Sequence, residues 1–176
     1  MNRVSKRYAK ALFELAKEQN KLDKIDSDFL ELKKLVDTHD GFNNFITNPL
    51  ISKSMRYQAV KQMFEAKFDD LTYRFLLLIN EKNRISLLAE MIERFNSLLL
   101  SHRNQVEGEV VSAVELSGLQ IGSIQKNIED LIGKTVILKQ RLDADVLGGF
   151  VVKVQDIIID NSVRYQLSKL REKLLA

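Results

Sequence analysis

The chain has 176 residues, of which 45% are hydrophobic and 29% are charged, and it contains no cysteine. This composition excludes an intrinsically disordered or low-complexity chain, and it excludes a fold held by disulfides or by thiolate-bound zinc. The net charge is only +3 and the basic residues are spread among acidic ones, so binding to nucleic acid is not expected.

No apolar segment of the chain is long enough to act as a signal peptide or a membrane span. The longest apolar run, residues 75–79, falls far short of the roughly 18–20 residues that cross a bilayer. We therefore expect a soluble, cytoplasmic chain without direct membrane insertion, linked to a membrane only through a partner.

The composition changes near residue 105. Valine and isoleucine together number 9 in residues 1–104 and 18 in residues 105–176, whereas eight of the nine phenylalanines lie in the first part. β-Branched residues favour pleated sheet, so the second part is the one expected to contain strands. The predicted fold class is α+β, with an N-terminal six-helix bundle (1–104) followed by a small C-terminal α/β domain (105–176).

Apolar spacing predicts the six helices in chain order. The first covers residues 4 to about 19, the second carries its apolar seam over 22–36, and a short third covers 42–46. The fourth begins after Ser52 or Ser54 and ends near Phe68. Asp69 and Asp70 suit the positive end of a fifth helix, and the sixth carries apolar residues from 88 to 99.

Strand and helix patterns alternate after residue 105. Alternating apolar residues predict strands at 106–110 and 136–142, separated by a helix over 121–131 that Gly133 ends. Residues 150–154 and 157–159 form a predicted hairpin that turns at Gln155 and Asp156. An amphipathic helix over 163–174 closes the chain.

The sequence offers no support for catalysis. Gly133-Lys134-Thr135 ends like a phosphate-binding loop, but Ile128 stands where that loop needs glycine, and the segment follows a helix rather than a strand. The aspartates at 23, 26 and 28 lack the glycine and the terminal glutamate of a calcium loop. We therefore expect no catalytic, cofactor-binding or metal-binding residues.

Two helices carry more apolar surface than a core requires. The first is apolar over about 200° of its circumference, twice the usual stripe. The fifth has one apolar face at Leu71, Phe75, Leu78 and Ile79, and another nearly opposite at Tyr73, Leu76 and Leu77. Such a helix either lies at the centre of its bundle or offers its second face to a partner helix, and both interpretations remain open at this point.

Three segments together resemble a known family. Residues 7–16 (RYAKALFELA), residues 80–88 (NEKNRISLL) and residues 147–152 (LGGFVV), the last continued by 156–164 (DIIIDNSVR), are similar to motifs of the delta subunit of F-type ATP synthases. The mitochondrial counterpart is the oligomycin-sensitivity-conferring protein. Gln155 and Asn161 depart from the family pattern, because glycine is expected at the first and is common at the second.

This resemblance implies a non-catalytic subunit of the peripheral stalk, or stator. The helical domain would bind N-terminal helices of the alpha subunits in the catalytic head. The C-terminal domain would bind the b subunit, the stalk that reaches the membrane, so that proton flow drives ATP synthesis. The expected location is peripheral, on the cytoplasmic face of a bacterial inner membrane, and no cofactor is implied.

The resemblance also implies a groove between the first and fifth helices. Its predicted partner-binding residues are Tyr8, Ala11, Leu12, Leu15, Leu71, Phe75 and Leu78. The opposite face of the fifth helix, at Tyr73, Leu76 and Leu77, remains an alternative. A helical adaptor that binds RNA or a transcription factor is the rival function, and the family motifs beyond residue 105 speak against it.

Overall fold

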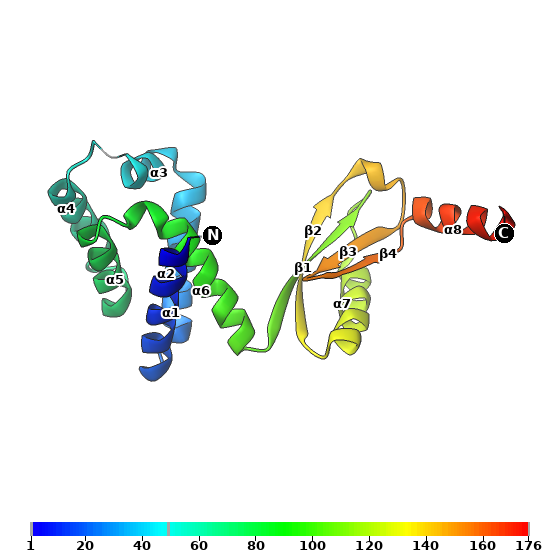
Figure 1. Cartoon of the computed structure of the whole chain (residues 1–176), viewed down its shortest axis with the longest axis horizontal. Coiled ribbons are helices and arrows are strands. Elements are labelled where there is room, and N and C mark those ends of the chain that lie inside the picture. Colours follow the sequence, from blue (N-terminus) through cyan, green and yellow to red (C-terminus); the bar gives the residue numbers. More distant parts are fainter. Residues whose placement is uncertain (1, 49, 176) are drawn as a thin grey trace. The chain divides into compact units, whose positions relative to one another are not determined.

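A computed structural model of the chain describes residues 2–48 and 50–175, and it combines helices with a four-stranded sheet (Figure 1). The chain divides into two compact units, Met1–Leu99 and Leu100–Ala176. The first contains α1 (Arg3–Glu18), α2 (Leu22–Thr38), α3 (Asp40–Thr47), α4 (Lys53–Phe64), α5 (Asp70–Glu81), a 3-10 turn (Ile85–Leu87) and most of α6 (Leu88–His102). The second contains β1 (Gln105–Ser112), α7 (Gly118–Ile132), β2 (Thr135–Leu142), a 3-10 turn (Ala144–Val146), β3 (Phe150–Val154), β4 (Ile157–Asp160) and α8 (Val163–Leu175).

Three helices of the first unit, α1, α4 and α5, begin at a side chain that accepts a hydrogen bond from a free backbone N–H group. The Ser52 hydroxyl accepts from the Met55 N–H at 3.2 Å, so Ser52 rather than Ser54 caps α4. The Asp69 carboxylate accepts from the Leu71 N–H at 3.0 Å and caps α5. The predicted start of α5 is therefore confirmed.

α4 is shorter than predicted, because it ends at Phe64 and not near Phe68. The chain turns after Phe64 and brings Phe68 back onto it, with the two rings stacked 4.8 Å apart. Phe68 is buried in the same core as the helix. Its apolar side chain thus continued the helical pattern beyond the point where the helix stops.

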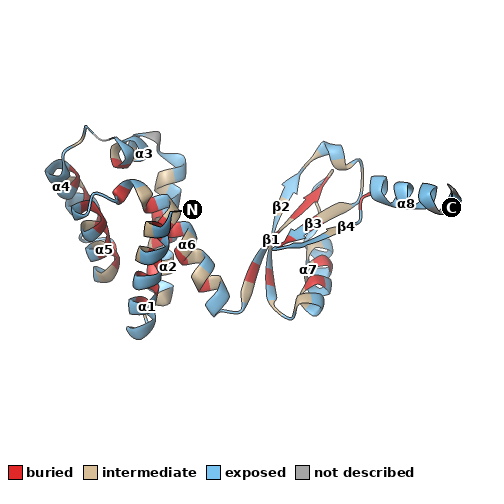
Figure 2. Cartoon of the chain, viewed as in Figure 1, coloured by how far each residue is buried: buried red, intermediate tan, exposed pale blue. Residues whose placement is uncertain are grey.

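Aromatic rings from four helices meet in the core of the first unit. Phe29 of α2 lies 4.9 Å from Phe95 of α6 and 6.0 Å from Phe75 of α5, measured between ring centroids. Phe13 of α1 contacts the same Phe95 at 5.9 Å. Such pairs contribute about 0.5–1.5 kcal/mol each beyond the burial of their area. Figure 2 shows that the buried residues line the inner sides of these helices.

The sheet of the second unit has the strand order β2-β1-β3-β4. β1 and β2 are parallel and are joined through α7, whereas β3 is antiparallel to both β1 and β4. Ile124 and Ile128 of α7 pack with Val110, Val136 and Val152 of the sheet. The predicted strands, the predicted helix between them and the hairpin are confirmed.

Gly133 and Gln155 both have positive φ and end elements of this unit. Gly133, at φ 71°, ends α7, and β2 begins at Thr135. Gly133-Lys134-Thr135 therefore connects a helix to a strand, and the predicted role of Gly133 as a C-cap is confirmed. Gln155, at φ 53°, forms the turn between β3 and β4, so it occupies the left-handed region where glycine is the least strained residue.

The face of the sheet away from α7 carries charged side chains. Glu107 and Glu109 of β1 lie 3.0 Å from Lys139 and Arg141 of β2, respectively. These ion pairs join the two parallel strands on a solvent-exposed face. Among the helices that the structure describes, none is both long and apolar enough to cross a membrane.

Candidate partner-binding surfaces

Two electrostatic contacts connect the α1 region with the two ends of α5. Lys21, just beyond the end of α1, places its Nζ 2.9 Å from the carboxylate of Asp69, which caps the start of α5. At the other end of α5, the pKa of Lys82 is raised, chiefly by its hydrogen bond to Glu81 and in smaller part by Tyr8 of α1. Lys21, just after α1, therefore lies at the start of α5, and Tyr8 of α1 lies toward the end of α5.

The seven predicted partner-binding residues differ in exposure, and together we name them the α1–α5 strip. Leu12 and Phe75 are buried, with 2% and 6% of their surface exposed. Leu15 and Leu78 are 45% and 42% exposed. Ala11 is exposed, and Tyr8 and Leu71 are half-buried. Within the strip, we call the buried Leu12 and Phe75 the floor and the exposed Leu15 and Leu78 the rim.

The burial of Phe75 corrects one expectation of the sequence analysis. Phe75 belongs to the core and contacts Phe29, so it is not an open wall of a groove. Leu12 is buried in the same way, and so is Leu76 on the alternative face of α5, at 1% exposure. Each apolar face of α5 therefore contributes a core residue, and partner binding by any of these residues remains a prediction.

Hydrogen bonds to a glutamate of α6 hold the start of α1. The Glu90 carboxylate accepts from the Asn2 backbone N–H and from the Ser5 hydroxyl, each at 3.0 Å. These bonds, the first of them most strongly, hold the pKa of Glu90 below its usual value. Because Tyr8 follows one turn after Ser5, this attachment also fixes the position of Tyr8.

The structure shows what one member of the aspartate cluster does. Asp28 accepts a hydrogen bond from the Asp69 backbone N–H at 3.0 Å, and so ties α2 to the start of α5. Within residues 2–48 and 50–175, no group of three or more acidic or histidine side chains is placed to hold a metal ion.

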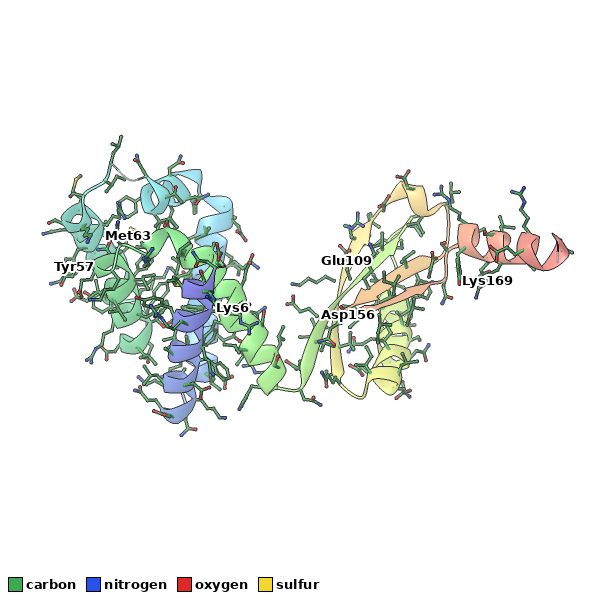
Figure 3. The ribbon with its side chains drawn as sticks, viewed as in Figure 1. Lys6, Tyr57, Met63, Glu109, Asp156 and Lys169 are labelled. Carbon is green, nitrogen blue, oxygen red and sulfur yellow. The ribbon has the colours of Figure 1, made fainter. Side chains whose placement is uncertain are left out.

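Sequence reasoning missed a cavity between α4 and α5. It has a volume of about 570 Å³ and is lined by Lys53, Ser54, Tyr57, Arg74, Leu77, Leu78, Asn80 and Glu81. Tyr57, labelled on α4 in Figure 3, is 44% exposed. Arg56, Val60 and Phe64 form the buried seam of α4. The one sequence signal for the cavity was therefore Tyr57, an aromatic residue beside this seam.

In the second unit, the most exposed apolar stripe lies on α8. The Ser162 hydroxyl caps this helix by accepting from the Tyr165 N–H at 3.2 Å. The pKa of Asp160 is lowered by its hydrogen bonds to the side chain and backbone of Ser162, so Asp160 in turn fixes the cap. Leu167 and Leu170 then project into solvent with more than half of their surface exposed.

A glycine pair sets where α8 begins. The Gly148 carbonyl accepts a hydrogen bond from the Val163 N–H at 3.0 Å. Gly149 has φ 77°, and a Cβ atom there would lie 2.3 Å from the backbone oxygen of Asn161. Only glycine allows this close approach, so the pair shapes the junction between β4 and α8.

A comparison with protein families covers both units. The family described as "ATP synthase delta (OSCP) subunit" matches residues 4–174. The chain belongs to this family.

Curated members of the delta (OSCP) family match over nearly their full length. The ATP synthase subunit delta of Chlorobaculum tepidum is 34% identical over 173 residues, covering 98% of this chain and 96% of the relative. That of Carboxydothermus hydrogenoformans is also 34% identical and covers 97% of this chain and 96% of the relative. The predicted resemblance is confirmed, and the chain is a non-catalytic, peripheral-stalk component of an F-type ATP synthase.

Solved structures of ATP synthases share the fold of this delta (OSCP) family member. A chain of the mitochondrial ATP synthase hexamer of Toxoplasma gondii is 23% identical, with a TM-score of 0.77 and coverage of 99% of both chains. A chain of the Polytomella F-ATP synthase, at 19% identity and a TM-score of 0.54, covers 58% of this chain. At these identities the likeness concerns the fold alone.

Proposed function

We propose that the chain is the joint between the catalytic head and the membrane-anchored stalk. In this proposal, the six helices of the first part act as one bundle (1–104) whose α1–α5 strip binds N-terminal helices of the alpha subunits. The second part (105–176) binds the b subunit. The site of action is the cytoplasmic face of a bacterial membrane, which the 34% identity to the Chlorobaculum and Carboxydothermus subunits supports.

The rim and floor of the strip are the observation that supports the head joint. An amphipathic helix needs an apolar surface that is already organised before it binds, because ordering the site on binding costs affinity. Leu12 and Phe75 form a fixed floor, and the exposed Leu15 and Leu78 offer apolar area to a ligand. A stator joint must resist slippage, so slow dissociation is the property that such a surface has to supply.

A titration of the full chain with an alpha-subunit N-terminal peptide tests this proposal. We expect binding that changes little between low and high salt, because burial of apolar area rather than charge pairing would provide the affinity. Leu78→Glu should weaken binding at least about tenfold, since a carboxylate on the rim would have to be desolvated. Isothermal titration calorimetry measures both effects.

Leu30→Glu is the matched control, because Leu30 is 55% exposed and lies on α2, outside the strip. The affinity of this variant for the peptide should equal that of the wild-type chain. If both variants lose affinity for the peptide equally, or if the wild-type chain does not bind it, the α1–α5 strip is not the joint with the catalytic head.

A further inference from the structure

α8 carries an apolar stripe that no described part of the chain covers. Val163, Leu167, Leu170 and Leu174 have between 46% and 85% of their surface exposed. The helix is anchored at its first residue, through the hydrogen bond from Val163 to Gly148. In Figure 1 the rest of α8 extends away from the sheet of its own unit. A short helix with this much exposed leucine is expected to have a partner.

The shape of the stripe distinguishes a partner helix from a lipid surface. At about 100° per residue, the four side chains fall within an arc of roughly 60°. A helix that faces a core or lies on a membrane has an apolar face at least about 100° wide, whereas a narrow seam is typical of coiled coils. The spacing of 4, 3 and 4 residues between these positions is also that of a coiled-coil seam.

Charged residues at the edge of this seam indicate the chemistry of the partner. Arg164 and Arg171 lie one heptad apart on the same edge of the seam, and both are exposed. Glu172, the acidic residue of α8, lies on the far side of the helix. Lys169 is also on the far side, where its ammonium group lies 4.8 Å from the centroid of the Tyr165 ring (Figure 3). The edge that meets a partner is thus basic.

We propose that α8 forms a short two-stranded coiled coil with an amphipathic helix whose seam is flanked by glutamate or aspartate. Residues at the flanks of a coiled coil pair across the interface, so acidic flanks would meet Arg164 and Arg171. This inference rests on the proposed function and deepens it, because the b subunit would supply that helix. A coiled coil of only two heptads binds weakly. Binding to the catalytic head would raise the effective concentration of the b-subunit helix near α8 and so strengthen the stalk joint.

Two synthetic peptides test the charge rule directly. Both contain three heptads with leucine at the seam positions, and they differ only in having glutamate or lysine at the flanking positions. Each is titrated into the ¹⁵N-labelled full chain while the amide signals of α8 are followed by NMR. The glutamate peptide should bind at least about tenfold more tightly than the lysine peptide, a difference of about 1.4 kcal/mol.

Charge reversal provides the matched variants. The double substitution Arg164→Glu and Arg171→Glu should reverse the preference between the two peptides. Lys169→Glu adds a carboxylate on the far side of the same helix and should leave the preference unchanged. Equal binding of the two peptides, or a loss of preference in Lys169→Glu, would overturn the proposal. So would α8 signals that respond to phosphatidylglycerol vesicles but to neither peptide.

The cytoplasmic fragment of the b subunit separates this inference from the proposed function. If that fragment binds the wild-type chain but not the double variant, both the coiled-coil inference and the proposed function are supported. If the glutamate peptide binds and the b fragment does not, the stalk joint of the proposed function fails while the coiled-coil property of α8 stands.

Discussion

Phe75 shows at the scale of one residue how a two-faced helix misleads sequence reasoning. Its spacing from Leu71 and Leu78 is that of a docking face, yet its ring contacts Phe29 in the core. Hydrophobic periodicity shows which face of a helix is buried only when the opposite face is polar. α5 has apolar residues on two faces, so its spacing does not identify the buried one. Leu15 and Leu78 on the rim and Leu12 on the floor have the same residue type, so only their packing distinguishes them.

We predict that Phe75→Glu unfolds the first unit. Loss of the ring from a packed core costs about 3–5 kcal/mol, and burial of a carboxylate adds to that loss. Urea unfolding followed by circular dichroism measures the effect. Leu78→Glu, on the exposed rim, should change the free energy of unfolding by less than about 1 kcal/mol. A stable Phe75→Glu variant would mean that this side chain can leave the core.

Asp69 gives the stability of the first unit a dependence on pH. Its pKa is lowered from the ordinary value of 3.8, chiefly by the hydrogen bond from the Leu71 N–H and next by Lys21. The ionised carboxylate therefore stabilises the fold above the unfolded-state pKa of 3.8. This contribution is lost as the pH falls below that value and through the lower pKa of the folded state.

Asp69→Asn tests this assignment, because asparagine still caps a helix but forms no ion pair with Lys21. We expect the variant to be less stable than the wild type by about 1 kcal/mol at neutral pH. The difference should shrink toward zero in strong acid. Melting temperatures of both proteins between about pH 7 and pH 2 measure it. A constant difference across that range would contradict the ion-pair explanation.

At the scale of elements, local chemistry determined most boundaries. Asp69 starts α5, Gly133 ends α7 and the β3–β4 hairpin turns at Gln155, all as the sequence predicts. The predicted end of α4 was wrong because Phe68 lies beyond the helix and still packs into the core, against Phe64. The cavity between α4 and α5 could not be predicted, because it depends on how two helices are packed and not on either sequence alone.

The junction between β4 and α8 requires glycine at position 149. Gly149→Ala would place a methyl group 2.3 Å from the Asn161 backbone oxygen, at a φ of 77° that disfavours alanine. We expect the second unit to lose about 1–3 kcal/mol. Gly118→Ala is the control, since nothing lies within 4 Å of the added methyl group and the residue is helical. Thermal unfolding of both variants should show a loss in the first and none in the second.

At the scale of the whole molecule, the two hydrophobic cores share no residue. We therefore predict that fragments 1–104 and 105–176 each fold alone, because each retains its own core. The amide hydrogen-exchange pattern of each fragment should match that of the same residues in the full chain. Loss of protection in either fragment would show that the units depend on each other for stability.

The strand directions of the second unit have a mechanical consequence. β1 begins at Gln105, where the chain arrives from the first unit, and β4 ends at Asp160, just before α8. These strands are parallel to each other and are separated by β3, which is antiparallel to both. Tension between the two ends therefore pulls β1 and β4 in opposite directions along the strand axis. The sheet is therefore loaded in shear, and the hydrogen bonds between its strands must break together and not one after another.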